Sequence, residues 1–295
     1  MTSHLILLNP HAGTSGQAEL IRDWARDRGH ELIETESAEE AHQRAAGAAL
    51  AGRTLLVAGG DGSVHAAVNG LLSSGASAPH FGVLPLGTGN DLVRSIGLPE
   101  DIEDVLVAYD ARRFHPLDAF EIFLDESSRF GINVASIGLG GRLAEAVTTE
   151  LKDRWGPLAY VLEGFTQATE AEAFPLTLKV DGRVLDESAL GILVANGRYA
   201  AGGFDVAPQA RVDDGLLDIV VVQPKGLVDR AVVAARLLAG DYTNSDSVLC
   251  MTCREVEITP PPGLSFNVDG ERGGGGVCRI EVRPAALRVL VPPTL

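Results

Sequence analysis

Three glycine-rich segments in the first third of the chain carry residue types that suit phosphate binding. Each follows a short apolar run and precedes residues with helical spacing, and the segments are Asn9–Gly16, Gly59–Gly62 and Gly87–Asn90. Glycine lets backbone N–H groups approach phosphate oxygens, and the N-terminus of a following helix adds partial positive charge. Because parallel strands place such turns at one edge of a sheet, the pattern predicts a phosphate-binding crevice there.

Two carboxylates, one within the second segment and one directly after the third, could hold a metal ion. Asp61 and Asp91 are expected to face the crevice, an arrangement that suits Mg²⁺ on a nucleotide, and Ser63 and Thr88 could donate hydrogen bonds. The alternative is that each segment is an ordinary turn or helix N-cap. No Lys precedes Lys152, so we expect backbone donors and a metal to provide most of the phosphate recognition.

Two further turns in the second half contain acidic residues. Asp269 and Glu271 would share one face of an extended segment, where repulsion between the carboxylates favours proton uptake by one of them and suits a general base. The alternative is an Asp-Gly turn followed by a solvated Glu. Asp213-Asp214-Gly215 could likewise be a hairpin turn.

The composition restricts the classes of function. Hydrophobic residues make up 45% and charged residues 22%, as in globular proteins, and the formal net charge is −16. This acidic balance argues against nucleic-acid binding and against attachment to an anionic membrane by overall charge. The sequence also lacks the P-loop, the Gly-x-Ser-x-Gly elbow, the His-Glu-x-x-His pair and a complete dinucleotide-binding fingerprint.

The cysteines and the N-terminal residues favour a cytoplasmic location. Three Cys cannot build a disulfide framework, and Cys250 and Cys253 on one strand would lie on opposite faces, which argues against a metal or redox pair. The N-terminus has no signal-peptide pattern, and polar residues, Gly and Pro interrupt the charge-free stretch Gly62–Asn90, so no spanning helix is expected. His65 and His115 are expected on a helix surface and in a loop.

The order of the elements predicts two kinds of structure. The first third predicts a parallel sheet with helices on both faces, and the β-rich runs from about Phe114 predict an antiparallel sheet domain. The first strands are expected at Leu5–Leu8, Glu31–Thr35, Thr54–Ala58 and Phe81–Leu84, with helices ending at Gly29 and spanning Ala38–Leu50 and Val64–Leu72. The later strands are expected at Phe114–Phe123, Phe130–Ile137, Leu176–Val180, Ala189–Ala195, Leu217–Val222, Val248–Thr259, Leu264–Val268 and Val277–Val282. Helices are expected near Leu139–Leu151, Leu158–Ala171 and Leu227–Leu238, and Gly273–Gly276 is expected to be a flexible loop.

These segments together resemble a known family. Gly59-Gly60-Asp61-Gly62-Ser63 is similar to the Gly-Gly-Asp-Gly-Thr signature of the diacylglycerol kinase catalytic superfamily, which includes sphingosine kinases and NAD kinases. The rest of the chain resembles the bacterial soluble lipid kinases of that superfamily. The matching segments are Asn9-Pro10-x-x-Gly13, Pro85–Asp91 with Arg94, Asn196-Gly197-Arg198-Tyr199, Asp214–Asp218 and Asp269-Gly270-Glu271.

The resemblance implies a nucleotide-binding α/β domain similar to NAD kinase and phosphofructokinase over residues 1–115. It further implies a β-sandwich lipid-acceptor domain over 116–283 and a segment over 284–295 that returns to the first domain. ATP would bind between the domains. The nucleotide-binding residues implied are Asn9, Thr35, Gly59, Gly60, Asp61, Gly62, Ser63, Gly87, Thr88, Asn90 and Asp91.

The resemblance also implies catalytic and metal-binding residues. Glu271 would be the acid/base, with Asp269 and Asp61 as further catalytic residues, and a structural Mg²⁺ would be held by Asp214 and the carbonyls of Arg211 and Leu216. The activity implied is Mg²⁺- and ATP-dependent phosphorylation of a lipid hydroxyl, with diacylglycerol giving phosphatidic acid as the first expectation. The enzyme would contact the membrane transiently from the cytoplasm. A homodimer is possible.

Departures from the family pattern keep a second class of function open. Ser63 replaces the usual Thr, and Ala66 stands where the family usually carries Glu, which favours weaker turnover or a nucleotide- or lipid-binding regulator. NAD kinase-like and sphingoid-base kinase activities also stay open. Candidate membrane-contacting residues are Arg142, Arg154, Trp155, Leu158 and Tyr160, and the alternative for them is packing at the edge of the core.

Overall fold

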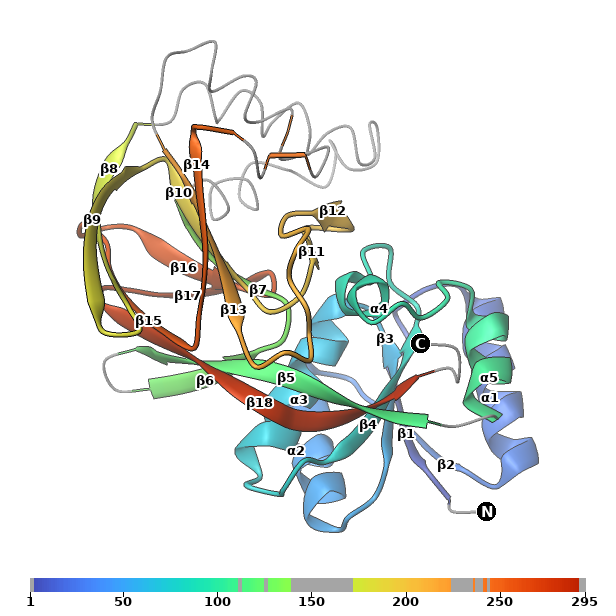
Figure 1. The fold of residues 1–295 in the computed structure, drawn as a ribbon. Coiled ribbons are helices and arrows are strands. Elements are labelled where there is room, and N and C mark those ends of the chain that lie inside the picture. The colour runs from blue at the N-terminus through green and yellow to red at the C-terminus, as the bar shows by residue number, and fades with distance from the viewer. Residues whose placement is uncertain are drawn as a thin grey trace.

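The computed structural model describes residues 3–110, 113–124, 127–138, 172–223, 236, 241–242 and 245–291. A layer of helices and parallel strands lies beside a domain built from antiparallel strands, and two long strands run from one into the other (Figure 1). Across those ranges, every helix is too short or too polar to cross a membrane.

Four parallel strands form the centre of the N-terminal domain. They are β1 (Leu5–Leu8), β2 (Glu31–Glu34), β3 (Leu55–Gly59) and β4 (His80–Pro85), in the spatial order β2-β1-β3-β4. Their neighbours are aligned in register, with Leu8 beside both Glu34 and Ala58. The predicted parallel sheet is therefore confirmed, and the four strands end at one common edge.

Helices cover both faces of this sheet. α1 (Ser15–Arg28) and α5 (Ile102–Asp110) lie on one face, and α2 (Ala38–Leu50) and α3 (Asp61–Ser73) lie on the other; α4 (Asp91–Ser95) is a short turn above the strand ends (Figure 1). Thr14 forms a capping box with Gln17 at the start of α1, and Ser37 caps α2, so these side chains define where both helices begin.

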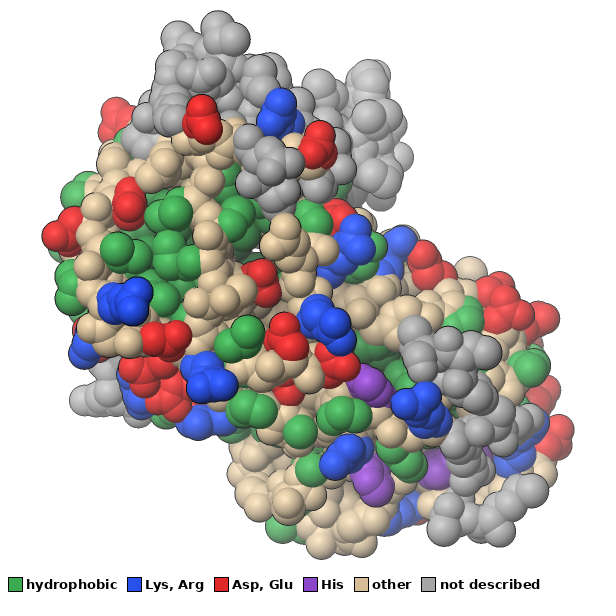
Figure 2. Space-filling model, in the orientation of Figure 1, with side chains coloured by type: hydrophobic (Ala, Val, Ile, Leu, Met, Phe, Trp, Pro, Cys, Tyr) green, Lys and Arg blue, Asp and Glu red, His purple; other side chains and the backbone are tan. Residues whose placement is uncertain are grey.

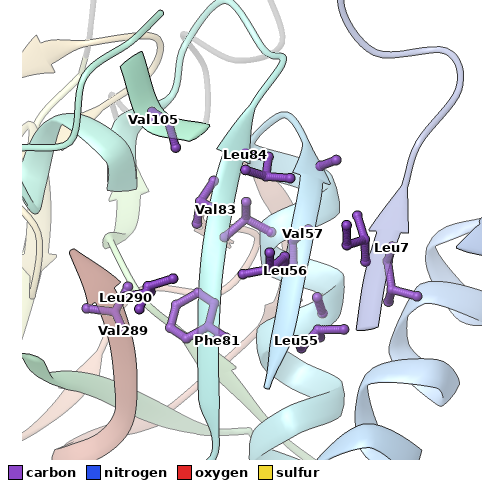
Figure 3. Close-up of a cluster of buried hydrophobic side chains, with 14 of the residues drawn as sticks. Leu7, Leu55, Leu56, Val57, Phe81, Val83, Leu84, Val105, Val289 and Leu290 are labelled. Atoms are coloured by element: carbon purple, nitrogen blue, oxygen red, sulfur yellow. The ribbon is translucent and has the colours of Figure 1, made fainter. Parts of the chain in front are cut away.

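Aliphatic side chains fill the space between the sheet and its helices. Leu56, Val57, Phe81 and Leu84 are each at most 2% exposed, and Leu290 of the last strand packs among them (Figure 3). Burial of this apolar surface, at about 25 cal/mol per Å², is the main stabilising contribution of the domain. The C-terminal strand therefore belongs to the core of the N-terminal sheet.

Two long strands join the domains. β18 (Cys278–Val291) pairs in parallel with β4 at Arg288 and Val289, and pairs antiparallel with β5 (Arg113–Leu124) along its length. The rest of this sheet contains β6 (Ser127–Gly131), β15 (Glu255–Thr259), β8 (Phe174–Val180) and β9 (Arg183–Ala189).

A second sheet completes the sandwich of the C-terminal domain. Its order is β14-β13-β10-β7-β16-β17, and a small hairpin of β11 and β12 projects from the domain towards α4. The bounds are β7 (Val134–Gly138), β10 (Gly191–Ala195), β11 (Tyr199–Ala200), β12 (Phe204–Asp205), β13 (Leu217–Val222), β14 (Val248–Cys253), β16 (Ser265–Val268) and β17 (Glu271–Gly275). Side chains of both sheets form one buried core, which confirms the predicted antiparallel domain.

The structure corrects several predicted elements. The predicted strands Phe130–Ile137 and Val248–Thr259 each divide into two strands that belong to different sheets. The predicted loop Gly273–Gly276 is wrong, since β17 covers Gly273 to Gly275; the Arg129 guanidinium lies against Gly273, where a Cβ would clash. The sequence patterns also failed to indicate α5 and β9. The helices predicted near Leu139–Leu151, Leu158–Ala171 and Leu227–Leu238 lie outside the described residues.

Candidate functional site

The three glycine-rich segments meet at the carboxyl edge of the parallel sheet. A Cβ on Gly60 would lie 3.2 Å from the Gly87 Cα, and one on Gly13 would lie 3.2 Å from the Leu86 Cβ. Asn9 Nδ2 donates to Ser63 Oγ at 3.1 Å, which joins the first segment to the second. Loops from three strand ends therefore form one continuous rim, as the sequence predicts for a shared crevice.

The N-terminus of α3 offers backbone donors at this rim. Strand β3 ends at Gly59, Gly60 is the N-cap, and no side chain caps the helix. N–H groups in the first turn of a helix that no side chain caps, together with the helix dipole, can bind an anion. Thr35 follows β2 at the same edge and is buried, whereas Thr88 is exposed on the third loop.

Asp61 fastens the third loop to the second. Its carboxylate accepts the backbone N–H groups of Asn90 at 3.0 Å and Asp91 at 2.8 Å, which holds Asn90 in the left-handed conformation at φ 50°. Burial raises the pKa of Asp61, and the two N–H donors oppose that rise. Asp61 therefore has a structural role, since it holds the third loop of the rim against the second.

Asp91 connects the rim to the C-terminal domain. Its carboxylate accepts the N–H groups of Gly203 at 2.6 Å and Gly202 at 3.3 Å, in the turn between β11 and β12. Burial and then the charge of Asp61 raise the pKa of Asp91 to about 6. The two carboxylates are close enough to repel each other, so a cation at the rim would stabilise both.

Asp269 and Glu271 lie on the hairpin of β16 and β17. Val268 pairs with Glu271 across a two-residue turn, in which Asp269 and Gly270 have φ values of 50° and 92°. The expectation of an extended segment with both carboxylates on one face is therefore wrong. Asp269 points inwards, with 2% of its side chain exposed, while Glu271 is exposed near the Arg129 guanidinium.

His65 is a site residue for which the sequence prediction was wrong. It lies on α3 with 13% of its side chain exposed, and its Nδ1 is 3.3 Å from Asp269 Oδ2. The prediction of a surface position overlooked that α3 faces the C-terminal domain. The spacing of His65 and Asn69, one helical turn apart, was the available signal.

The turn after Val212 brings acidic residues together. Asp214 Oδ1 accepts the N–H of Leu216 at 3.0 Å, and Asp118 Oδ2 accepts that of Gly215 at 2.7 Å. Burial and then the charge of Asp214 raise the pKa of Asp218 to about 6. Among the described residues, no group of three or more His, Cys, Asp or Glu side chains is arranged around a common metal position. A cation here would therefore depend on Asp214 and on carbonyl oxygens, such as those of Arg211 and Leu216, which are hard donors that suit Mg²⁺.

The remaining predicted positions have simple structural roles. His115 lies on β5, not in a loop, and its Nε2 is 2.8 Å from Asp213 Oδ2. Cys250 is exposed and Cys253 is buried, so the two thiols of β14 lie on opposite faces, as predicted. Asp118 was missed although a charged residue within the apolar run Leu117–Phe120 was a visible signal; it also accepts the N–H of Ala285 at 2.6 Å.

Comparison with protein families agrees with this architecture. The model described as diacylglycerol kinase catalytic domain matches residues 3–122. The model described as YegS C-terminal NAD kinase beta sandwich-like domain matches residues 133–291. Fold and matched domains thus define a kinase of the diacylglycerol kinase type.

Comparison with individual proteins identifies the family within this class of kinases. A protein named "Probable lipid kinase YegS-like" from Pseudomonas aeruginosa strain PAO1 is 32% identical over 297 residues, covering 99% of this chain and 96% of the relative. A "Diacylglycerol kinase" from Staphylococcus aureus strain JH9 is 29% identical over 75% of this chain and 68% of the relative. The chain belongs to the YegS-like lipid kinase family.

Solved structures show the same fold. A diacylglycerol kinase from Bacillus anthracis strain Sterne superposes with a TM-score of 0.76 at 21% identity, covering 99% of this chain and 97% of the other. A yeast NADH kinase in complex with NADH gives a TM-score of 0.56 at 14% identity, covering 99% and 84%. The predicted relation to both kinase folds is therefore confirmed.

Proposed function

We propose that the protein transfers the γ-phosphoryl group of ATP to a lipid hydroxyl, with diacylglycerol as the first acceptor. The observation that carries the proposal is the contact between the Gly60 and Gly87 loops at an uncapped helix N-terminus. Backbone donors there suit a polyphosphate, which is what a kinase of this family must bind.

The nucleotide would lie against the rim between the two domains. Its binding residues would be Asn9, Thr35, Gly59–Ser63, Gly87, Thr88, Asn90 and Asp91, with Asp61 and Asp91 near the phosphates. Mg²⁺ would neutralise phosphate charge when bound there, and the raised pKa values of both carboxylates fit a place where negative charge needs a cation. A second Mg²⁺ would hold the turn at Asp214.

Glu271 would act as the general base. The acceptor hydroxyl oxygen attacks the γ-phosphorus, the bond from that phosphorus to the β,γ-bridging oxygen breaks, and ADP leaves. The hydroxyl proton passes to the Glu271 carboxylate, which is exposed and can face an incoming acceptor. Positioning and charge neutralisation provide most of the rate enhancement in such reactions.

Because the proposed acceptor is a membrane lipid, the enzyme would contact the cytoplasmic face of a membrane transiently. On the face drawn in Figure 2, the Lys and Arg side chains of the described residues are scattered among acidic ones rather than gathered in one patch. Together with a net charge of −16, this favours docking through apolar contacts. The candidate membrane-contacting residues Arg142, Arg154, Trp155, Leu158 and Tyr160 lie outside the described residues.

A single panel experiment tests the proposal. The protein is incubated with γ-labelled ATP and Mg²⁺ in the presence of diacylglycerol, sphingosine, phosphatidylglycerol or NAD, with Glu271→Gln as the control. We expect label in a lipid, with diacylglycerol labelled fastest. Labelled NADP would show that the protein is an NAD kinase and would contradict the proposed lipid kinase activity. ATP binding without transfer to any acceptor would favour a regulator, which Ala66 at the usual Glu position would fit.

A further inference from the structure

The turn that carries Glu271 has a fixed geometry. Asp269 and Gly270 both have positive φ values, which defines the tight turn typical of two-residue hairpins. Only one residue separates Asp269 from Glu271, so the position of the Asp269 side chain limits where Glu271 can lie.

Three backbone groups hold the Asp269 carboxylate. Oδ2 accepts the N–H of Ile132 at 2.7 Å, and Oδ1 accepts those of Asn133 and Val134 at 2.9 Å each. Ile132 and Asn133 lie in the connection between β6 and β7, and Val134 is the first residue of β7. With both oxygens engaged and the side chain 2% exposed, Asp269 anchors the hairpin and is poorly placed to contact a substrate.

The fourth partner of Asp269 comes from the other domain. His65 Nδ1 lies 3.3 Å from Asp269 Oδ2, and His65 Nε2 lies 3.3 Å from Asn69 Nδ2. A carboxylate only accepts, so the Nδ1–H of His65 donates to Asp269. The Asn69 amide nitrogen also donates to the His65 carbonyl oxygen at 3.0 Å and lies beside the other edge of the ring.

Asn69, one turn further along α3, also contacts the C-terminal domain. Its Nδ2 donates to Phe130 O and its Oδ1 accepts the N–H of Phe130, both at 2.9 Å. This pair holds α3 against β6, while His65 reaches past it to the hairpin. α3 begins at Asp61, so one rigid helix connects the glycine rim to the turn before Glu271.

We propose that His65 is a positioning residue that couples the nucleotide rim to the general base, by holding Asp269 and with it the hairpin of Glu271. The inference rests on the proposed function for the role of Glu271. The contact itself rests on His65, Asp269 and the backbone of Ile132–Val134.

Substitutions of different shape separate this role from ordinary packing. In His65→Asn the amide nitrogen lies near the place of Nδ1 and can still donate to Asp269; in His65→Gln it lies near the place of Nε2, and in His65→Ala no donor is left. His42→Ala is the matched control, because His42 is a histidine of α2 that contacts Ser73 on α3 away from the hairpin.

Amide hydrogen exchange of the intact protein tests the contact without any assay of activity. We expect exchange over residues 131–138 and 265–275 to be about tenfold faster in His65→Ala and His65→Gln, because the hairpin anchor loses a buried donor. His65→Asn and His42→Ala should match the wild type. Unchanged exchange in His65→Ala would overturn the proposal whatever the enzyme phosphorylates.

A double-mutant cycle tests the catalytic consequence. We expect His65→Ala to lower kcat about 10- to 100-fold, with the Kd of ATP within about twofold, since a misplaced base slows the chemical step. In a Glu271→Gln background, measured in single turnover, the same substitution should cost less than about twofold. An equal loss in both backgrounds would show that His65 does not act through Glu271. Absence of any lipid product from the wild type would defeat the proposed function, while the exchange result would still decide the contact.

Discussion

Asp91 accepts a 2.6 Å hydrogen bond from the backbone N–H of Gly203, and this contact ties the N-terminal rim to the C-terminal domain. The N–H of Asp91 in turn donates to Asp61 at 2.8 Å. A chain of hydrogen bonds therefore runs from the Gly59–Gly62 loop through two carboxylates to the hairpin of β11 and β12. A change of charge at either carboxylate alters the contact between the domains.

The raised pKa of Asp91 predicts a defined dependence of stability on pH. Burial, followed by the charge of Asp61, raises this pKa from 3.8 to about 6, so the folded protein holds the proton to higher pH than the unfolded chain does. Below about pH 4 the group is protonated in both states, and as pH rises to about 6 its contribution to the free energy of unfolding falls by roughly 2–3 kcal/mol. Asp91→Asn removes this charge. Its stability relative to wild type should therefore rise by a similar amount between about pH 4 and pH 7.

Chemical denaturation at a series of pH values measures that difference. Asp104→Asn serves as the control, because Asp104 is exposed on α5 and removal of its charge leaves the rim intact. Parallel stability curves for Asp91→Asn and wild type would contradict the prediction.

The contact between the glycine loops predicts a selective loss of nucleotide affinity. In Gly87→Ala the new Cβ would lie 2.7 Å from the Gly60 Cα and 3.0 Å from Asn90 Oδ1, so the two loops must separate. We expect ATP binding to weaken about tenfold or more and stability to fall by about 1–3 kcal/mol. Titration with a fluorescent ATP analogue and denaturant unfolding measure the two effects.

Gly47→Ala is the matched control for this substitution. A Cβ on Gly47, inside α2, would meet nothing within 4 Å. Because alanine favours helix, this variant should be about 0.5–1 kcal/mol more stable and should bind ATP normally. Equal ATP affinity in the two variants would show that loop contact is not needed for binding.

The rim was predictable from the sequence because the residues that form it follow directly after predicted strands. Glycines and Asp residues directly after buried strands at Gly59–Gly62 and Gly87–Asn90 need only the parallel order of the strands to meet. The resemblance to lipid kinases then added the nucleotide and the lipid acceptor, while the β-rich runs after Phe114 had already predicted a second domain. The predicted helix Ala38–Leu50 matches α2 to the residue because Ser37 caps it and the apolar spacing is regular.

The missed features depend on contacts between distant segments. His65 looks like a surface residue until α3 is placed against Asp269, 204 positions later in the chain. An Asp-Gly turn at Asp269 was one of the two interpretations open from the sequence, but its inward-facing carboxylate was not foreseen, because its N–H donors at Ile132–Val134 lie far away in the chain. Gly273 belongs to a strand because β17 pairs with β16, and Arg129 of β6 lies against it; no local glycine pattern reveals either contact.

The acidic turn at Asp214 predicts stabilisation by Mg²⁺. Burial and the charge of Asp214 hold the pKa of Asp218 at about 6, so above pH 6 this region carries repulsion that a divalent cation would relieve. At pH 8, millimolar Mg²⁺ should raise the Tm of wild type by about 2–4 °C, and by less at pH 5, where Asp218 is protonated. Differential scanning fluorimetry measures both shifts.

Asp214→Asn should abolish that shift, whereas Asp104→Asn should keep it. A Mg²⁺-dependent Tm that survives in Asp214→Asn would place the stabilising ion elsewhere, and a wild-type Tm without Mg²⁺ dependence would leave the segment as a plain turn.

The exposed carboxylate of Glu271 predicts a variant that binds but does not react. Glu271→Gln keeps the size and polarity of the side chain and removes the proton acceptor, so we expect kcat for lipid phosphorylation to fall by about 10²–10⁴ while the Kd of ATP changes less than about twofold. The fold should be unaffected, because Glu271 is exposed and its backbone alone pairs with Val268. Glu257→Gln on β15 is the matched control, since it removes a carboxylate from another strand of the C-terminal domain. Near-normal turnover in Glu271→Gln would remove Glu271 from the role of base and would direct attention to Asp61 at the rim, which the resemblance also gives as a catalytic residue.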